Sequence, residues 1–351
     1  FDASLGAKPI QLATALALSS GDCEIDGTNF SGDIRGPDNG PEAQITITSS
    51  QNLLKNIRLR MGDQAGATSN GDNISWLSGE GLNLVNVSCS GDNDGAFDIA
   101  NGAAQDYLTI RNSFFWGSFS EPHSDPSDHA YSWLWYGADP LHFSIANTIT
   151  ANTKRNPRTK GAEIDRAEFV NVWFAGGVFN QCWVADENEA NTANFLGCFL
   201  QKNALNTSVT DVDLVTFDSG TGSCSVFFGG CKLSDGTGFS NGTGTVTTAG
   251  TQYSSPIESG IDAVSTDLPG YLSPIIGARG GGSLDTMDAR ALANLNNNCA
   301  GVYNSTNQLA NPRFGLTNVK TRGTDVSTTA PVIGNKFSFE FDFMAGPIGS
   351  V

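Results

Sequence analysis

Short runs of residues that favour β-strands recur along most of this chain, at intervals of roughly 25–35 residues. Glycine, asparagine, aspartate and serine separate the runs, and no amphipathic helix pattern lies between them, which disfavours an α/β sheet. The expected strands are Ala43–Ile47, Leu53–Leu59, Ile74–Leu77, Leu82–Val87, Ala96–Ile99, Tyr107–Ile110, Trp133–Tyr136, Phe143–Ile145, Phe169–Phe174, Ala193–Leu196 and Ser225–Phe228. Repeats of this length indicate an all-β solenoid, in which each coil packs on the next.

An asparagine motif within these runs favours the solenoid over a β-sandwich, which is the second fold considered. Asn52-Leu53-Leu54 is followed by Asn83-Leu84-Val85. We expect these asparagines to form an inward ladder; the simpler interpretation is an asparagine beside a turn.

Charge and hydropathy narrow the class of protein. The net charge is −17 with only 19 lysines and arginines, which argues against nucleic-acid binding. No run of 18 apolar residues occurs, so no membrane span is expected. The apolar segment Ile10–Ser19 lacks a preceding basic stretch and is a poor signal peptide, while a chain that starts at Phe1 fits a processed terminus. Strong acidity favours a secreted, extracellular protein, and we expect a monomer.

The cysteines leave two interpretations open. Cys182 lies close in sequence to Cys198, as does Cys224 to Cys231, and no pair has the CxxC spacing of a zinc site. Two disulfides are one interpretation, and buried thiols stacked in successive coils are the other.

Past residue 280 the pattern changes. Leu284, Met287, Ala291 and Leu292 have helical spacing, and Ser283 or Asp285 is the expected N-cap. A single helix here would cap one end of the solenoid. We expect a β-helix domain over residues 1–301 and a C-terminal extension, 302–351, that packs on it.

Five stretches together resemble the pectate lyase superfamily, specifically family 1 polysaccharide lyases. Asn52–Asp63 is similar to the family's NVIIRNLRIRxGD, and Gly71–Trp76 to GDAISI. Asn86–Asp98 keeps the spacing of HCSLSxxxDGxxD, Arg155–Arg158 matches RNPR, and Phe169–Phe174 is similar to RNNVIYN. The resemblance implies a right-handed parallel β-helix with three sheets, and cleavage of a uronate-containing acidic polysaccharide by β-elimination.

The resemblance covers about residues 43–301 and has departures. The family's WIDH strand reads Leu84-Val85-Asn86 here, so its Asp and His are absent. The HDK segment with its substrate-binding lysine is also absent, and residues 128–132 resemble an HGYGS variant instead.

Carboxylates make the first candidate site. Asp94 and Asp98 are four residues apart along a strand, which puts both side chains on one face, and Asp72 lies one coil earlier. Three converging carboxylates form an oxygen-rich site for a hard cation. By the resemblance these residues are calcium ligands, and Asn70 occupies the position of a further acidic ligand. A solvated acidic face is the alternative interpretation.

Basic residues make the second candidate site. Lys154, Arg155, Arg158 and Lys160 place 4 of the 19 basic residues within seven positions. Arginine forks suit bidentate recognition of carboxylates. By the resemblance Arg155 is the catalytic base, while Lys160 and Arg158 bind the uronate. We also expect Lys154 to bind substrate and His129 to contact a sugar hydroxyl or the leaving oxygen. A solvated basic loop and a packed histidine are the alternatives.

Tyr131, Trp133, Trp135 and Trp116 suggest a stacking platform for sugar rings, although aromatic residues on strands are more often core. Two further function classes stay open. A hydrolase on the same fold would use aspartates as general acid and base, and a phage-type or other glycan-binding protein would only grip its ligand.

Overall fold

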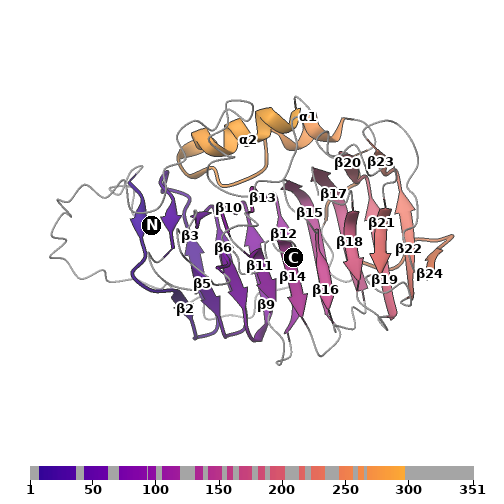
Figure 1. The fold of residues 1–351 in the computed structure, drawn as a ribbon, viewed down its shortest axis with the longest axis horizontal. Coiled ribbons are helices and arrows are strands. Elements are labelled where there is room, and N and C mark those ends of the chain that lie inside the picture. Colours follow the sequence, from indigo (N-terminus) through magenta and orange to yellow (C-terminus); the bar gives the residue numbers. More distant parts are fainter. Residues whose placement is uncertain are drawn as a thin grey trace, which may run out of the picture.

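The computed structural model is a right-handed parallel β-helix whose coils stack side by side along the long axis (Figure 1). The structure describes residues 8–36, 43–61, 71–92, 94–99, 105–118, 131–136, 141–151, 156–160, 166–175, 181–185, 190–201, 213–217, 223–233, 245–255, 260–264 and 267–296. The expected C-terminal extension, 302–351, lies outside these residues.

Every described strand pairing is parallel, and the strands fall into three columns that we call sheets 1, 2 and 3. Sheet 1 contains β2 (Leu16–Leu18), β5 (Ile45–Ile47), β8 (Ile74–Trp76), β11 (Gly95–Ile99), β14 (Tyr131–Tyr136), β16 (Arg158–Lys160), β18 (Gln181–Ala185) and β21 (Asp213–Phe217). Sheet 2 contains β3 (Glu24–Asp26), β6 (Asn52–Lys55), β9 (Gly79–Val85), β12 (Gln105–Arg111), β19 (Ala190–Leu196), β22 (Ser223–Gly229) and β24 (Thr245–Thr248). Sheet 3 contains β1 (Ile10–Gln11), β4 (Ile34–Arg35), β7 (Arg58–Arg60), β10 (Ser88–Ser90), β13 (Phe114–Trp116), β20 (Phe199–Gln201) and β23 (Lys232–Leu233).

Two long strands, β15 (His142–Ala151) and β17 (Arg166–Ala175), begin in sheet 2 and continue into sheet 3. The three-sheet prediction is therefore confirmed, and each expected strand overlaps a described one. The apolar run Leu53–Leu59 differs in detail, because a turn at Asn56 divides it between β6 and β7.

Alternating side chains from all three sheets fill the interior. Trp133 and Trp135 are buried in this interior, and Trp116 is buried in a second apolar cluster outside it, so the expected sugar platform on these tryptophans is wrong. The Tyr131 side chain lies outside the described residues. Aromatic rings stack from coil to coil, as between Phe169 and Phe195, whose centroids are 4.5 Å apart.

An asparagine ladder lines the turn between sheets 2 and 3. Five asparagines in successive coils have positive φ there: Asn56, Asn86, Asn112, Asn147 and Asn171. Side-chain amides connect Asn86 to Asn56 at 2.9 Å and Asn171 to Asn147 at 3.0 Å. Asparagine suits this position because it tolerates the left-handed conformation.

The ladder expected at Asn52 and Asn83 is wrong. Asn52 is in register with Leu82, and Asn83 is in register with Leu53, so the two asparagines do not stack on each other.

The chain then runs back along the solenoid as α1 (Leu268–Leu272), a 3-10 turn η2 (Gly280–Gly282) and α2 (Thr286–Asn296). These elements lie along the flank of sheet 3, where Leu272, Ala291 and Leu295 pack on Trp116 and Trp173 (Figure 1). The expected cap over a solenoid end is therefore wrong, because the apolar stripe of the helix covers the outer face of a sheet instead.

The expected N-cap at Asp285 is confirmed. The Asp288 backbone N–H donates to Asp285 Oδ1 at 2.7 Å.

Neither expected disulfide is present, because Cys198, Cys224 and Cys231 are thiols and not half-cystines. Register places Cys198 next to Cys231 in the following coil, as expected for stacked thiols. The Cys182 side chain is outside the described part of the chain.

Candidate functional site

Three of the expected calcium ligands meet on the outside of sheet 1. Asp72 precedes β8, Asp94 precedes β11 and Asp98 lies within β11, which pairs with β8 in parallel register. One carboxylate oxygen from each lies within 4.8 Å of the other two. We call this group the aspartate triad. Calcium–oxygen distances are about 2.3–2.6 Å, so two ligands on one ion are at most about 5 Å apart, and the triad fits such an ion.

Local packing holds the triad together. Ser75 Oγ donates to Asp72 Oδ2 at 2.6 Å, and the Gly95 backbone N–H donates to Asp72 Oδ1 at 3.2 Å. The Leu134 backbone N–H donates to Asp98 Oδ1 at 3.3 Å. A Cβ at Gly95 would lie 1.9 Å from Asp98 Oδ1, so glycine is required for Asp98 to fold back over its own strand.

The electrostatics of the triad oppose its full ionisation. Burial, and then the neighbouring Asp94 carboxylate, raise the pKa of Asp72 well above its usual range. Burial, followed by Asp72 and Asp94, has the same effect on the pKa of Asp98. Desolvation and like charges both disfavour carboxylate anions. The triad therefore gains stability by holding protons or by binding a cation that takes their place.

Arg158 lies on the same surface as the triad. Asp98, Leu134 and Arg158 are in register on three successive strands of sheet 1. Their inward neighbours, such as Phe97 and Thr159, are fully buried, so this row faces outward. Two strand spacings separate Asp98 from Arg158, or about 10 Å between Cα atoms. A sugar acid bound beside the triad is therefore within reach of the guanidinium.

The start of β16 is anchored to its neighbour. Asn156 is buried, and its side-chain oxygen accepts a hydrogen bond from Thr150 Oγ1 on β15. The backbone of Lys160 lies in β16, two residues after Arg158. The other predicted site residues, Asn70, His129, Lys154 and Arg155, lie outside the described residues, as does the Lys160 side chain.

Asp92 is a buried carboxylate that the sequence analysis did not identify. Ser118 Oγ, from the next coil, donates to Asp92 Oδ2 at 2.9 Å. Burial raises the pKa of Asp92 to about 8, although the Ser118 hydrogen bond opposes the shift. The signal was present in the run from Asp92 to Asp94, where a second carboxylate stands two residues before a predicted ligand.

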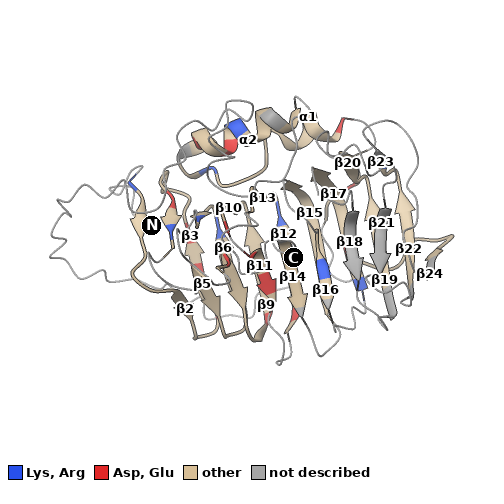
Figure 2. Cartoon of the chain, in the orientation of Figure 1, with Lys and Arg blue, Asp and Glu red and all other residues tan. Residues whose placement is uncertain are grey.

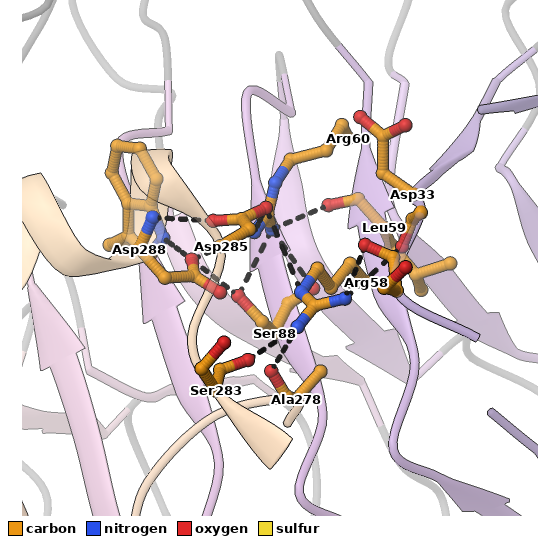
Figure 3. A network of polar contacts seen from close by, with 12 residues as sticks. Asp33, Arg58, Leu59, Arg60, Ser88, Ala278, Ser283, Asp285 and Asp288 are labelled. Atoms are coloured by element: carbon orange, nitrogen blue, oxygen red, sulfur yellow. Dashed lines mark hydrogen bonds and ion pairs between the residues drawn. The ribbon is translucent and has the colours of Figure 1, made fainter. Parts of the chain in front are cut away.

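A second cluster of charged groups lies under α2 on the flank of sheet 3 (Figure 3). Arg60 forms ion pairs with Asp288 at 2.8 Å and with Asp285 at 3.1 Å. Asp288 Oδ1 also accepts from Trp116 Nε1 and Ser88 Oγ, each at 2.7 Å.

Arg58 completes this cluster. It donates to the backbone carbonyls of Ser31, Ala278 and Ser283 at 2.8–2.9 Å. We call Arg58, Arg60, Asp285 and Asp288 the arginine clasp, because they join β7 to the helical segment.

Most of the described strand residues are uncharged, with acidic and basic residues at scattered positions along the chain (Figure 2). Within the described residues, no helix is long and apolar enough to cross a membrane. Neither known family models nor characterised proteins give a match to this chain.

Proposed function

We propose that this protein is a secreted polysaccharide lyase that cleaves a uronate-containing acidic glycan with the help of bound calcium. The supporting observation is the convergence of the aspartate triad with Arg158 on one outward row of sheet 1. Carboxylate oxygens at this spacing suit calcium, and the arginine suits a sugar carboxylate. The resemblance to family 1 polysaccharide lyases adds the reaction type.

The chemistry requires removal of the proton on C5 of the uronate, next to its carboxylate. The C5–H electron pair forms the C4=C5 double bond, and the glycosidic oxygen on C4 leaves and takes up a proton. Calcium bound between protein and substrate carboxylates would stabilise the negative charge that builds up on the uronate. The triad holds the cation, and Arg158 orients the sugar acid by paired N–H donors.

Arg155 is the proposed base, on the strength of the RNPR resemblance. Arginine is an unusual base because its reference pKa is above 12, and the neighbouring Lys154, Arg158 and Lys160 would supply a cationic field that favours its neutral form. The same cluster offsets the repulsion between a polyanionic substrate and a chain of net charge −17.

The test is an assay for the ultraviolet absorbance of the conjugated alkene, over a panel of polyuronates with chelator or with calcium. We expect absorbance with calcium and none in chelator. Hydrolysis would release reducing ends without the alkene, and a pure binding protein would release neither.

Two variants then separate the roles of the basic residues. Arg155→Lys should lose most of kcat while substrate still binds, because lysine keeps the charge but loses the planar fork. Lys160→Ala should chiefly raise KM. Near-native kcat in Arg155→Lys would end the assignment of Arg155 as the base.

A further inference from the structure

Tyr107 is an exposed tyrosine in a backbone conformation that tyrosine rarely adopts. Its φ is +60°, and 48% of its surface is exposed. A left-handed backbone costs an ordinary residue roughly 1–2 kcal/mol. A half-exposed ring also buries less apolar surface than a ring in the core, so it stabilises the fold less.

The turn that leads into sheet 2 explains the left-handed backbone of Tyr107 but does not explain why the side chain is aromatic. Residues at the same register in the three preceding coils, Asp22, Gln51 and Gly81, also have positive φ. The left-handed residue is thus a property of this turn in successive coils. Of these four coils, only the fourth has an aromatic side chain at this position.

The ring of Tyr107 is held in a fixed orientation. It stacks on the His142 ring of the next coil, with centroids 5.5 Å apart and planes 12° from parallel. Asp106 Oδ1 lies 2.9 Å from His142 Nδ1 and accepts the backbone N–H groups of both Tyr107 and His142 at 2.8 Å. One carboxylate therefore orients both members of the stack.

In the coil on the other side, a glutamine amide lies at the position next to this ring. The residue there is Gly81, which brings no side chain to the row. The exposed Gln51 side chain reaches across it, with its amide nitrogen 2.6 Å from the position that a Cβ of Gly81 would take. An oriented aromatic ring thus lies beside a side-chain amide that can both donate and accept hydrogen bonds.

We propose that Tyr107 and His142 form a stacking subsite for an uncharged pyranose ring of a glycan, with the Gln51 amide hydrogen-bonded to its hydroxyl groups. Aromatic faces match the apolar C–H face of a sugar, and the amide supplies polar contacts. Glu80 is in register with Asp106, so two carboxylates flank the platform. Their negative charge disfavours a uronate beside Tyr107 and favours a neutral sugar there, while the cation Arg166 is in register with His142, one coil further from Tyr107.

The subsite does not rest on the proposed lyase activity. Tyr107 lies at the start of sheet 2, whereas the aspartate triad lies on sheet 1. The two together would suit a heteropolymer that carries both acidic and neutral sugars.

Affinity electrophoresis of the whole protein tests the proposal. Gels would contain galactan, glucomannan or xylan as neutral polymers and polygalacturonate as the charged one, all with chelator present. We expect at least one neutral polymer to retard the native protein, and Tyr107→Asn to weaken that affinity about tenfold. Asparagine adopts positive φ readily, so this variant removes the ring without adding strain.

Matched variants complete the design. Tyr107→Phe should bind like the native protein, because the ring remains. Tyr271→Asn should also bind normally, because Tyr271 is another exposed tyrosine (39%) but lies on α1. Asp94→Asn should leave neutral-polymer binding intact, which separates this site from the triad.

Three results would overturn the proposal. They are no retardation by any neutral polymer, equal retardation of the native protein and Tyr107→Asn, and a Tyr107-dependent preference for polygalacturonate. A lower Tm in Tyr107→Asn with unchanged retardation would instead assign Tyr107 a purely structural role.

Discussion

The aspartate triad and the arginine clasp are two clusters of buried carboxylates on different sheets of one solenoid, and they are stabilised in opposite ways. In the clasp, burial tends to raise the pKa of Asp285, but Arg60 and Arg58 outweigh it and hold that pKa below its usual value. In return, Asp288 and Asp285 hold the pKa of Arg60 above its usual value, against the effect of burial. The cluster supplies its own counter-charge.

In the triad, the neighbouring charges that raise the pKa of Asp72 and Asp98 are carboxylates. Burial and like charge act in the same direction there. The difference separates a structural cluster, complete within the chain, from one whose charge balance needs an added proton, cation or ligand. Burial raises the pKa of Asp288 in the clasp as well, although Arg60 opposes that shift. The sign of the neighbouring charges therefore distinguishes the two regions better than burial does.

The largest effect is expected from breaking the clasp. Arg60→Met keeps much of the side-chain volume but removes the guanidinium that pairs with the buried Asp288. This loss should lower the free energy of unfolding by about 3–5 kcal/mol. Urea denaturation followed by circular dichroism would measure it.

Arg35 provides the control, because it is in register with Arg60 on the adjacent strand and its ion pair with Asp33 is solvent-accessible. Arg35→Ala should cost less than about 1 kcal/mol. Equal losses in the two variants would contradict the view that burial makes the clasp structural.

Calcium should stabilise the folded protein through the aspartate triad and not through the arginine clasp. At about one hundred times its dissociation constant, a ligand of the native state adds about 2.7 kcal/mol of stability. We expect calcium to raise Tm in the native protein and in Asp285→Asn, but not in Asp94→Asn. Differential scanning calorimetry with calcium and then chelator would measure this, and a calcium response retained in Asp94→Asn would refute the metal site.

One carboxylate from each region, Asp92 and Asp285, should make stability depend on pH in opposite ways. Asp92, beside the triad, has a folded-state pKa of about 8, above its unfolded value. Its contribution is therefore present in full below the unfolded pKa and is lost as pH rises through the folded pKa. Asp285 acts in the opposite sense, and its contribution is lost as pH falls through its lowered pKa.

In chelator, stability should thus fall as pH rises from about 5.5 to about 7. Asp92 alone contributes about 2 kcal/mol of this loss, at about 1.36 kcal/mol per pH unit, and Asp72 and Asp98 act in the same direction. Asp92→Asn should reduce the slope by the share of one group, while Asp285→Asn should not reduce it. A native profile that rises over this interval would contradict the raised pKa.

The two clusters were not equally visible in the sequence. The triad could be predicted because parallel stacking puts residues at one register side by side, and Asp72, Asp94 and Asp98 occupy neighbouring registers of two successive coils. The clasp could not be predicted, because Arg60 and Asp285, which form a hydrogen bond, are 225 residues apart in the sequence.

The helix and its N-cap were predicted correctly, but the prediction that the helix covers a solenoid end was wrong for a related reason. Its spacing indicated that one face of α2 is buried, but periodicity does not identify the surface that covers it. Likewise, the turn at Asn56 interrupts a run of apolar residues in which no Gly or Pro marks a boundary.

The smallest effect concerns two arginines that the sequence does not distinguish. Arg158 lies partly exposed on the outward row of the triad, whereas Arg58 is almost fully buried under α2. Arg158→Lys should raise KM for a polyuronate about fivefold, or about 1 kcal/mol, because lysine cannot make the paired contact, while kcat and Tm stay near native. Arg58→Lys should show the reverse, a lower Tm with unchanged KM, since one ammonium cannot reach the carbonyls of both Ser31 and Ala278. Steady-state kinetics and thermal denaturation of both variants would check this. A change in Tm without a change in KM for Arg158→Lys would show that Arg158 has a structural role and does not bind substrate.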